Sequence, residues 1–421
     1  MGSSKVVKNT AMLYIMSFAK LIFPLLTLPY LTRVLSEDSY GLVSYVKSCM
    51  SYVQLLIDFG FILSSVKDIV NANGDKKKIG YVAGNTFAAK SILCAVSLVL
   101  LFAMCLFIDI LKMNLLFVFL SFVSVGITAF LADFLFRGIE KMHHITFIYL
   151  ISKGVSVLLT FLLVKNDDQL LLIPILDIVT NLISVLLSFV IIRKMDIPIH
   201  MSGIKDCLAM IKDSFMYFLS SVATTAFAAL NTVLIGIFIK DLTLVAYWSL
   251  CLSITSAIQG LYTPITNSVY PHMIKEKNLA FIHKLLALFM PIVSAGCALC
   301  YILSDFIMLV AGGEKYLPAA ELFNWFIPIL FFSFPAQVYG WPTLGAVGKV
   351  KETTTSTVIA AVAQVMGLAI LILFNSFNLV SLAALRVSTE ALLLAVRMYF
   401  TYKNRTAFAS PNNGESKENT I

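Results

Sequence analysis

The chain has 421 residues, of which 59% are apolar and 13% charged, and its mean hydropathy is +0.90. Soluble domains carry roughly a quarter charged residues, so a water-soluble globular enzyme is excluded and a membrane protein is predicted. The formal net charge of +8 would suggest nucleic acid in a soluble protein. In a membrane protein, lysine and arginine instead mark cytoplasmic loops, so we expect no nucleic acid partner.

Apolar stretches of helical length follow one another along the whole chain. A bilayer-spanning helix needs about 20 apolar residues, whereas a strand of a membrane barrel shows about ten residues of alternating character. The continuous runs therefore predict an all-α integral membrane protein with about 12 transmembrane helices. These helices are expected at residues 11–31, 41–63, 81–108, 115–136, 145–164, 170–192, 215–239, 243–268, 285–310, 320–345, 354–374 and 379–401.

Cations are distributed unevenly over the connections between these helices. With the N-terminus inside, twenty lysines and arginines fall in inner segments and five fall in outer loops. Because cytoplasmic loops carry the excess, both termini are predicted to be cytoplasmic. The polar segment at residues 403–421 is expected to be a disordered cytoplasmic tail. Six cations remain inside predicted helices, namely Lys20, Lys47, Lys90, Lys153, Arg386 and Arg397.

The longest inner connection, at residues 193–214, separates the first six predicted helices from the last six. Two six-helix lobes around a central cavity are the natural division, with the N-lobe at residues 1–200 and the C-lobe at residues 201–402. Many transporters are built from two such halves and bind their substrate between them.

Polar side chains mark one face of the second predicted helix. Ser44, Lys47, Ser51, Gln54 and Asp58 follow one another at intervals of three or four residues, which places them on one helical face. A charged residue at the bilayer centre costs roughly 2.5–3.5 kcal/mol on insertion scales. We therefore expect such a face to line a cavity or to contact partner charges, and not to face lipid.

Three of the lysines inside helices share one depth. Lys20, Lys90 and Lys153 lie about eight to ten residues from the cytoplasmic starts of their helices, about 12–15 Å at 1.5 Å per residue, which is near the midplane. We interpret the first half as the wall of a water-filled cationic cavity for an anionic substrate such as a phosphate, a pyrophosphate or an acidic sugar. Its predicted binding residues are Lys20, Lys47, Lys90 and Lys153.

Aspartates in the same helices offer an alternative to a binding cavity. Asp58, Asp133 and Asp177 could hold the lysines in buried structural salt bridges. Lys47, about six residues from the outer end of its helix, could also extend its ammonium to the outer surface. Both alternatives stay open at the level of sequence.

The second half is polar but almost uncharged, except in its last helix. Arg386 and Glu390 are four residues apart and can neutralise each other as a pair. The functional interpretation is a protonatable carboxylate near the midplane that links ion movement to transport. Asp58, Asp177, Arg386 and Glu390 are thus candidates for ion coupling or for charge pairing.

Several chemistries have no motif in this chain. Its seven cysteines and five histidines form no metal or redox pattern, and it has no Gly-x-x-x-x-Gly-Lys-Ser/Thr phosphate loop, so we expect no cofactor, no metal and no ATP hydrolysis. The rival class is a membrane glycosyltransferase, polymerase or ligase. Such an enzyme needs a sizeable catalytic loop, whereas the predicted outer loops do not exceed about ten residues. We therefore expect a protein that is not an enzyme.

Short segments near the ends of several predicted helices carry a recognisable combination of residues. They are Pro24-x-x-x-x-Pro29-Tyr30-Leu-Thr-Arg33, Tyr40-Gly41, Leu56-Ile-Asp58-Phe-Gly60-Phe, Ala246-Tyr247-Trp248-Ser249, Gly312-Gly-Glu-Lys-Tyr316, Gly345-x-x-Gly348-Lys349 and Ser388-Thr389-Glu390. In this order they resemble the Wzx-type polysaccharide repeat-unit flippases of the multidrug/oligosaccharidyl-lipid/polysaccharide exporter superfamily.

The resemblance implies a multi-pass protein of the bacterial plasma membrane with two six-helix lobes and a V-shaped central cavity. By alternating access, such a flippase carries undecaprenyl-pyrophosphate-linked oligosaccharide to the outer leaflet for O-antigen or capsule synthesis. Membrane lipids, a polysaccharide polymerase and chain-length machinery are the other implied partners. The superfamily also contains drug/cation antiporters, the runner-up, which a cationic cavity disfavours. Family members often carry arginine in the cavity, whereas the first half of this chain offers lysine, a point charge without the bidentate fork.

Overall fold

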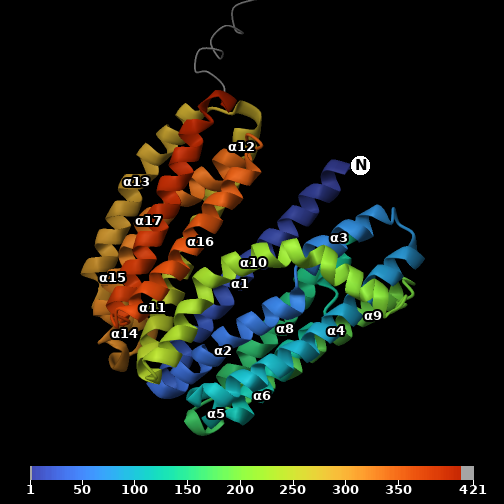
Figure 1. Ribbon diagram of the computed structural model, residues 1–421, viewed down its shortest axis with the longest axis horizontal. Helices are drawn as coiled ribbons and strands as arrows, with labels where there is room; N and C mark the ends of the chain where they lie inside the picture. Colours follow the sequence, from blue (N-terminus) through green and yellow to red (C-terminus); the bar gives the residue numbers. More distant parts are fainter. Residues whose placement is uncertain (1, 409–421) are drawn as a thin grey trace, which may run out of the picture. The chain divides into compact units, whose positions relative to one another are not determined.

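The computed structural model describes the backbone of residues 2–408 and their side chains, apart from those of residues 2–8, 10, 220 and 223–228. Helices joined by short connections make up the described chain (Figure 1). Eleven segments among the described residues are long and apolar enough to cross a membrane, which confirms the all-α membrane architecture. The span expected at residues 215–239 falls in α10 (Ile204–Phe238), whose described part includes the shorter apolar segment Ala229–Phe238.

The chain divides into two compact units, Met1–Ala246 and Tyr247–Ile421, and the boundary falls within α11 (Leu242–Gly260). Besides α10, the first unit contains α1 (Gly2–Val34), α2 (Glu37–Asp58), α3 (Phe61–Asn71), α4 (Lys76–Phe107), α5 (Asp109–Met113), α6 (Leu115–Thr128), α7 (Asp133–Gly138), α8 (Met142–Leu163), η1 (Asp167–Gln169) and α9 (Leu172–Lys194). The second contains α12 (Thr263–Glu276), α13 (Leu279–Ile302), α14 (Ser304–Gly312), η2 (Glu314–Tyr316), α15 (Ala319–Val338), η3 (Tyr339–Gly345), α16 (Val350–Leu373), α17 (Leu379–Lys403) and η4 (Arg405–Ala407).

Polar side chains cap the starts of several long helices. The Ser36 hydroxyl accepts a hydrogen bond from the backbone N–H of Ser39 at the start of α2, and the Asp75 carboxylate accepts from two N–H groups at the start of α4. Asn278 and Asn378 do the same for α13 and α17. These caps satisfy N–H groups that have no partner within the helix, so the short polar connections fix where each span begins.

Within the first unit, α2 packs against α4, α6 and α10, while α1 packs against α8 and α9 packs against α6 and α8. Aromatic and aliphatic side chains fill the space between α3, α4, α7 and α8, with Phe87 and Phe134 in edge-to-face contact at 5.4 Å. Because α10 packs on α2 and α4, the boundary between the units lies after it. The division into six-helix lobes at residue 200 stays a prediction.

The helix expected at residues 41–63 is interrupted at its inner end. Phe59 and Gly60 adopt left-handed backbone angles, with φ of 39° and 80°, so α2 ends at Asp58 and α3 starts at Phe61. A Cβ atom at Gly60 would lie 2.5 Å from the Cβ of Tyr217, so both the turn and the close packing require glycine here. The break leaves Asp58 at a helix end.

The connection between α9 and α10 runs along one face of α4. Gly80 and Gly84, one helical turn apart, let the backbone of Pro198 and His200 approach α4 closely. Asn85 then fastens the connection, since its side chain accepts from the N–H of Ser202 at 2.9 Å and donates to the Ser202 hydroxyl at 3.2 Å. The longest predicted inner connection is therefore docked onto the first unit.

In the second unit, α15 packs against α13, α14 and α17, and α16 packs against α17. Trp248 of α11 is fully buried and meets Phe326 of α15 edge to face at 4.8 Å. Of the tail expected at residues 403–421, residues 403–408 are described and include η4, while residues 409–421 lie outside the described residues.

Candidate functional site

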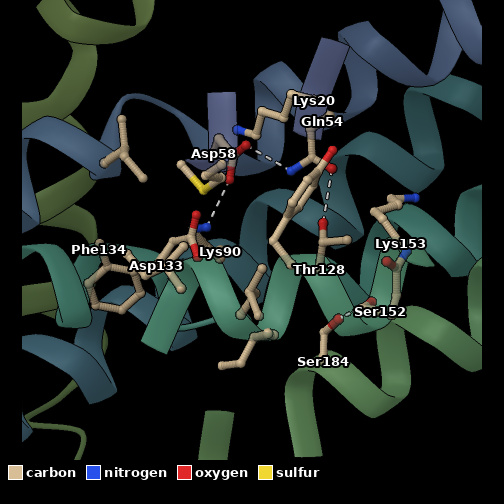
Figure 2. Close-up of a pocket in the computed structure, with 17 residues that line it drawn as sticks. Lys20, Gln54, Asp58, Lys90, Thr128, Asp133, Phe134, Ser152, Lys153 and Ser184 are labelled. Carbon is tan, nitrogen blue, oxygen red and sulfur yellow. Dashed lines mark hydrogen bonds and ion pairs between the residues drawn. The ribbon is translucent and has the colours of Figure 1, made fainter. Parts of the chain in front are cut away.

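A cavity of about 260 Å³ lies within the first unit. Five charged side chains line it, namely Lys20, Asp58, Lys90, Asp133 and Lys153, together with the polar Gln54, Thr128, Ser152, Asn181 and Ser184. They come from seven helices of this unit, α1, α2, α4, α6, α7, α8 and α9, as Figure 2 shows for the labelled residues. Its volume lies just below the roughly 300–1,000 Å³ of ordinary ligand sites.

A chain of hydrogen bonds crosses the wall of this cavity. The Nζ atom of Lys90 on α4 lies 2.8 Å from Oδ1 of Asp58 at the end of α2, and only 8% of the lysine side chain is exposed. Nε2 of Gln54 donates to the other carboxylate oxygen of Asp58 at 2.7 Å, and Thr128 on α6 donates to Oε1 of Gln54 at 2.9 Å. Both dashed contacts of the aspartate are visible in Figure 2. The chain therefore ties α4, α2 and α6 together.

A second ion pair lies on the other side of the cavity. Nζ of Lys153 on α8 lies 3.3 Å from Oδ1 of Asp177 on α9, and about a third of each side chain is exposed. The charges of Asp177 and Lys153 also act on Lys47, which is itself exposed and is not among the residues that line the cavity. Beside this pair, the hydroxyls of Ser152 and Ser184 are in hydrogen-bond contact at 2.5 Å.

Lys20 differs from the other two cavity lysines. It is exposed on α1, and its Nζ atom lies 5.5 Å from the centre of the Tyr149 ring on α8. Within the part of the chain that the structure describes, no carboxylate lies within ion-pair distance of it. Asp133 also lines the cavity and interacts electrostatically with Arg137, Lys20 and Lys90. The ammonium of Lys20 is thus the cavity cation that is available to a ligand.

The structure combines features of both sequence interpretations. Lys20, Lys90 and Lys153 do line the same cavity, while Asp58 and Asp177 form the ion pairs of the alternative interpretation with Lys90 and Lys153.

Two polar wall residues, Thr128 and Ser152, are not singled out by the sequence patterns. Gln54 lies on the polar face of α2, and its amide oxygen needs a hydrogen-bond donor from a neighbouring helix. The structure supplies Thr128 as that donor, so a search for a polar residue facing Gln54 could have located it.

The charged residues of α17 lie in the second unit and are fixed by neighbours. Nη1 of Arg386 lies 3.7 Å from Oε2 of Glu390, and the two side chains are 13% and 9% exposed. Arg397 donates from Nη1 to the carbonyl oxygen of Ala336 at 2.7 Å and from Nε to the Ser356 hydroxyl at 3.2 Å. Because Ala336 and Ser356 lie on α15 and α16, Arg397 holds three helices of this unit together.

Comparison with known proteins gives a consistent result. A family model described as "Polysaccharide biosynthesis protein" matches residues 6–277. A "Putative O-antigen transporter" of Escherichia coli (strain K12) is 24% identical over 411 residues, which cover 94% of this chain and 97% of that protein. A protein of the same name from Shigella dysenteriae is 25% identical over 279 residues, which cover 66% of this chain and 70% of that protein.

Solved structures of two transporter types share the fold. The inward closed conformation of the lipid II flippase MurJ matches with a TM-score of 0.68 and 14% identity, and the match covers 94% of this chain and 87% of that one. The inward-facing conformation of a MATE family multidrug resistance transporter of the MOP superfamily matches with a TM-score of 0.67 and 14% identity, covering 95% of this chain and 98% of that one. At this identity the likeness concerns the fold alone.

Proposed function

Because the chain belongs to the polysaccharide biosynthesis protein family, we propose that it is a flippase for lipid-linked oligosaccharides. In this proposal, undecaprenyl-pyrophosphate-linked repeat units move from the inner to the outer leaflet of a bacterial plasma membrane by alternating access. The units then serve surface polysaccharide synthesis, such as that of O-antigen or capsule. The names of the two curated relatives, both putative O-antigen transporters, support this assignment.

The observation that carries the proposal is the set of three lysines on one polar cavity in a membrane protein. Three lysines against two aspartates give the lining residues a formal charge of +1. Placing a cation inside the membrane costs free energy, so such cations occur where they contact a ligand, a partner charge or water. A pyrophosphate headgroup supplies the matching negative charge, and the ammonium groups of lysine bind phosphate as point charges.

The proposal extends to the surroundings of the protein. We place both termini in the cytoplasm, following the excess of cations in the predicted inner segments. The lobes predicted at residues 1–200 and 201–402 would open alternately to the two sides of the membrane. A polysaccharide polymerase and chain-length machinery are the proposed protein partners, because they consume the repeat units on the outer side.

Purified protein in liposomes tests this function directly. The liposomes carry a polyprenyl-pyrophosphate-linked oligosaccharide with a fluorescent sugar, and a membrane-impermeant reductant quenches the label in the outer leaflet. We expect the protected inner half of the signal to become accessible with the protein and to stay protected in protein-free liposomes. A label that stays protected, together with uptake of an organic cation in a parallel assay, would favour the drug/cation antiporter. Lengthening of the glycan during the incubation would instead favour a polymerase or glycosyltransferase.

Glu390 tests whether ion movement is coupled to transport through the second unit. Like Asp58, Asp177 and Arg386, it is a candidate for ion coupling or for charge pairing, and its buried carboxylate is a group that can carry a proton within the membrane. We expect Glu390→Gln to remove most of the pH dependence of transport between pH 6 and 8. Unchanged transport over this range would instead assign Glu390 to charge pairing with Arg386. The double variant Arg386→Gln/Glu390→Gln serves as the control that removes both charges of the Arg386–Glu390 pair together.

A further inference from the structure

The three lysines of the cavity are not equivalent in their contacts. Lys90 is nearly buried and holds Asp58 at 2.8 Å, whereas Lys20 is exposed and lies over the aromatic ring of Tyr149. A ligand anion that approached Lys90 would have to compete with a carboxylate already in contact. The same anion would reach Lys20 without displacing a protein group.

Both carboxylate oxygens of Asp58 are already in contact with protein groups. Lys90 contacts its Oδ1 atom and Gln54 donates to its Oδ2 atom, while Gln54 accepts from Thr128 in turn. Each of these side chains thus already has a partner within the network. Such a connected network fixes the positions of its residues.

The hydrogen-bonded network of Lys90, Asp58, Gln54 and Thr128 also lies next to a break in the helical backbone. Asp58 is the last residue of α2, directly before the left-handed pair Phe59 and Gly60 that separates α2 from α3. Lys90 links this helix end to α4, and Gln54 links it to α6 through Thr128. The residues that stabilise the break between α2 and α3 therefore also line the cavity.

From these contacts we propose that Lys90 is a positioning residue. It acts through Asp58 and Gln54 to hold the ends of α2 and α6 in place, and so leaves Lys20 as the cation that the anionic group of the substrate contacts. This division of roles rests on the proposed flippase function. The proposal predicts opposite effects on the apparent KM when Lys20 and Lys90 are each neutralised together with a nearby aspartate.

Compensating neutralisation distinguishes a positioning pair from a ligand contact. Lys90→Gln alone leaves the Asp58 carboxylate without its cation, and Asp58→Asn alone leaves the nearly buried Lys90 without its anion. Both single variants should therefore transport poorly. The double variant Lys90→Gln/Asp58→Asn removes both charges but keeps groups that can hydrogen-bond. We expect it to transport with an apparent KM for lipid-linked oligosaccharide within about twofold of that of the wild type.

Lys20 should behave in the opposite way. Lys20→Gln removes a charged contact to the ligand, which corresponds to about a tenfold or larger rise in apparent KM at an unchanged melting temperature. Its matched double variant, Lys20→Gln/Asp133→Asn, restores the charge balance of the cavity but returns no cation to the ligand. We therefore expect this double variant to keep the raised KM.

The experiment measures KM, maximal rate and melting temperature for these five variants in the liposome assay. The division of roles is overturned if Lys90→Gln/Asp58→Asn, folded by size-exclusion chromatography, raises the KM as much as Lys20→Gln does. It is equally overturned if Lys20→Gln leaves the KM unchanged. Failure of the proposed function looks different, because the wild-type protein itself then moves no lipid-linked oligosaccharide in the same assay. If a single variant does not fold, the two double variants decide the question.

Discussion

Replacing Lys20, Lys90 and Lys153 together by glutamine should abolish surface polysaccharide in cells that depend on this protein, while the protein still inserts into the membrane. The substitutions leave Asp58 and Asp133 on the cavity wall without a lysine, so the formal charge of the lining residues changes from +1 to −2. An anionic headgroup then meets repulsion in place of attraction, and like charges at close range cost several kcal/mol. The triple variant also removes the positioning contact of Lys90, so both effects act in the same direction.

Surface polysaccharide by gel electrophoresis, with protein levels from membrane fractions, measures this prediction. The matched control is Lys76→Gln/Lys77→Gln/Lys78→Gln, which removes the same charge from exposed residues at the start of α4, away from the cavity lining. Its topology is checked by labelling, because cations at this position contribute to orientation. Normal polysaccharide from the cavity variant, at wild-type protein levels, would refute the assignment of these lysines to substrate transport.

A single methyl group at Gly80 should destabilise the first unit. The Cβ atom of alanine would lie 1.7 Å from the carbonyl oxygen of Pro198 and 2.8 Å from its carbonyl carbon. Both are backbone atoms, so the connection between α9 and α10 has to move, and its contacts through His200 and Ser202 are put at risk. Overpacking of this kind costs about 1–3 kcal/mol. We expect a lower melting temperature in detergent for Gly80→Ala.

Gly296→Ala provides a control with the same chemical change. Gly296 also lies inside a helix, α13, but apart from the backbone of its own helix and its chain neighbours nothing lies within 4 Å of the Cβ position. Because alanine favours a helix over glycine by roughly 0.5–1 kcal/mol, this variant should be neutral or slightly more stable. Equal melting temperatures for the two variants would show that the connection next to Gly80 moves aside at little cost.

The family segments acquire physical reasons only from the structure. Gly41 of the Tyr40-Gly41 pair lets the carbonyl of Leu242 approach α2, since a Cβ atom there would lie 2.0 Å from that oxygen. Gly60, in the segment that follows Asp58, forms the left-handed turn after α2. Trp248 of the later segment is fully buried against α15. A sequence motif shows which residues are present, but it does not show the neighbouring residues in space that require them.

The sequence by itself determined the class of the protein and the positions of its spans. Apolar runs of about 20 residues suffice for this, because the bilayer acts on each helix separately and sets its length. Helical periodicity likewise placed Gln54 and Asp58 on one face of α2, since that spacing is local. The shared depth of Lys20, Lys90 and Lys153 stays a prediction from counting residues along each helix.

Only the tertiary structure decided what those charges meet. Lys90 and Asp58 are 32 residues apart, and Lys153 and Asp177 are 24 residues apart, so helix packing and not spacing makes them pairs. Lys20 has the same predicted depth as the paired lysines, yet among the described residues no carboxylate lies within ion-pair distance of it. The physical reason is that the partner of a buried charge is chosen by the geometry of neighbouring helices, which no single helix encodes.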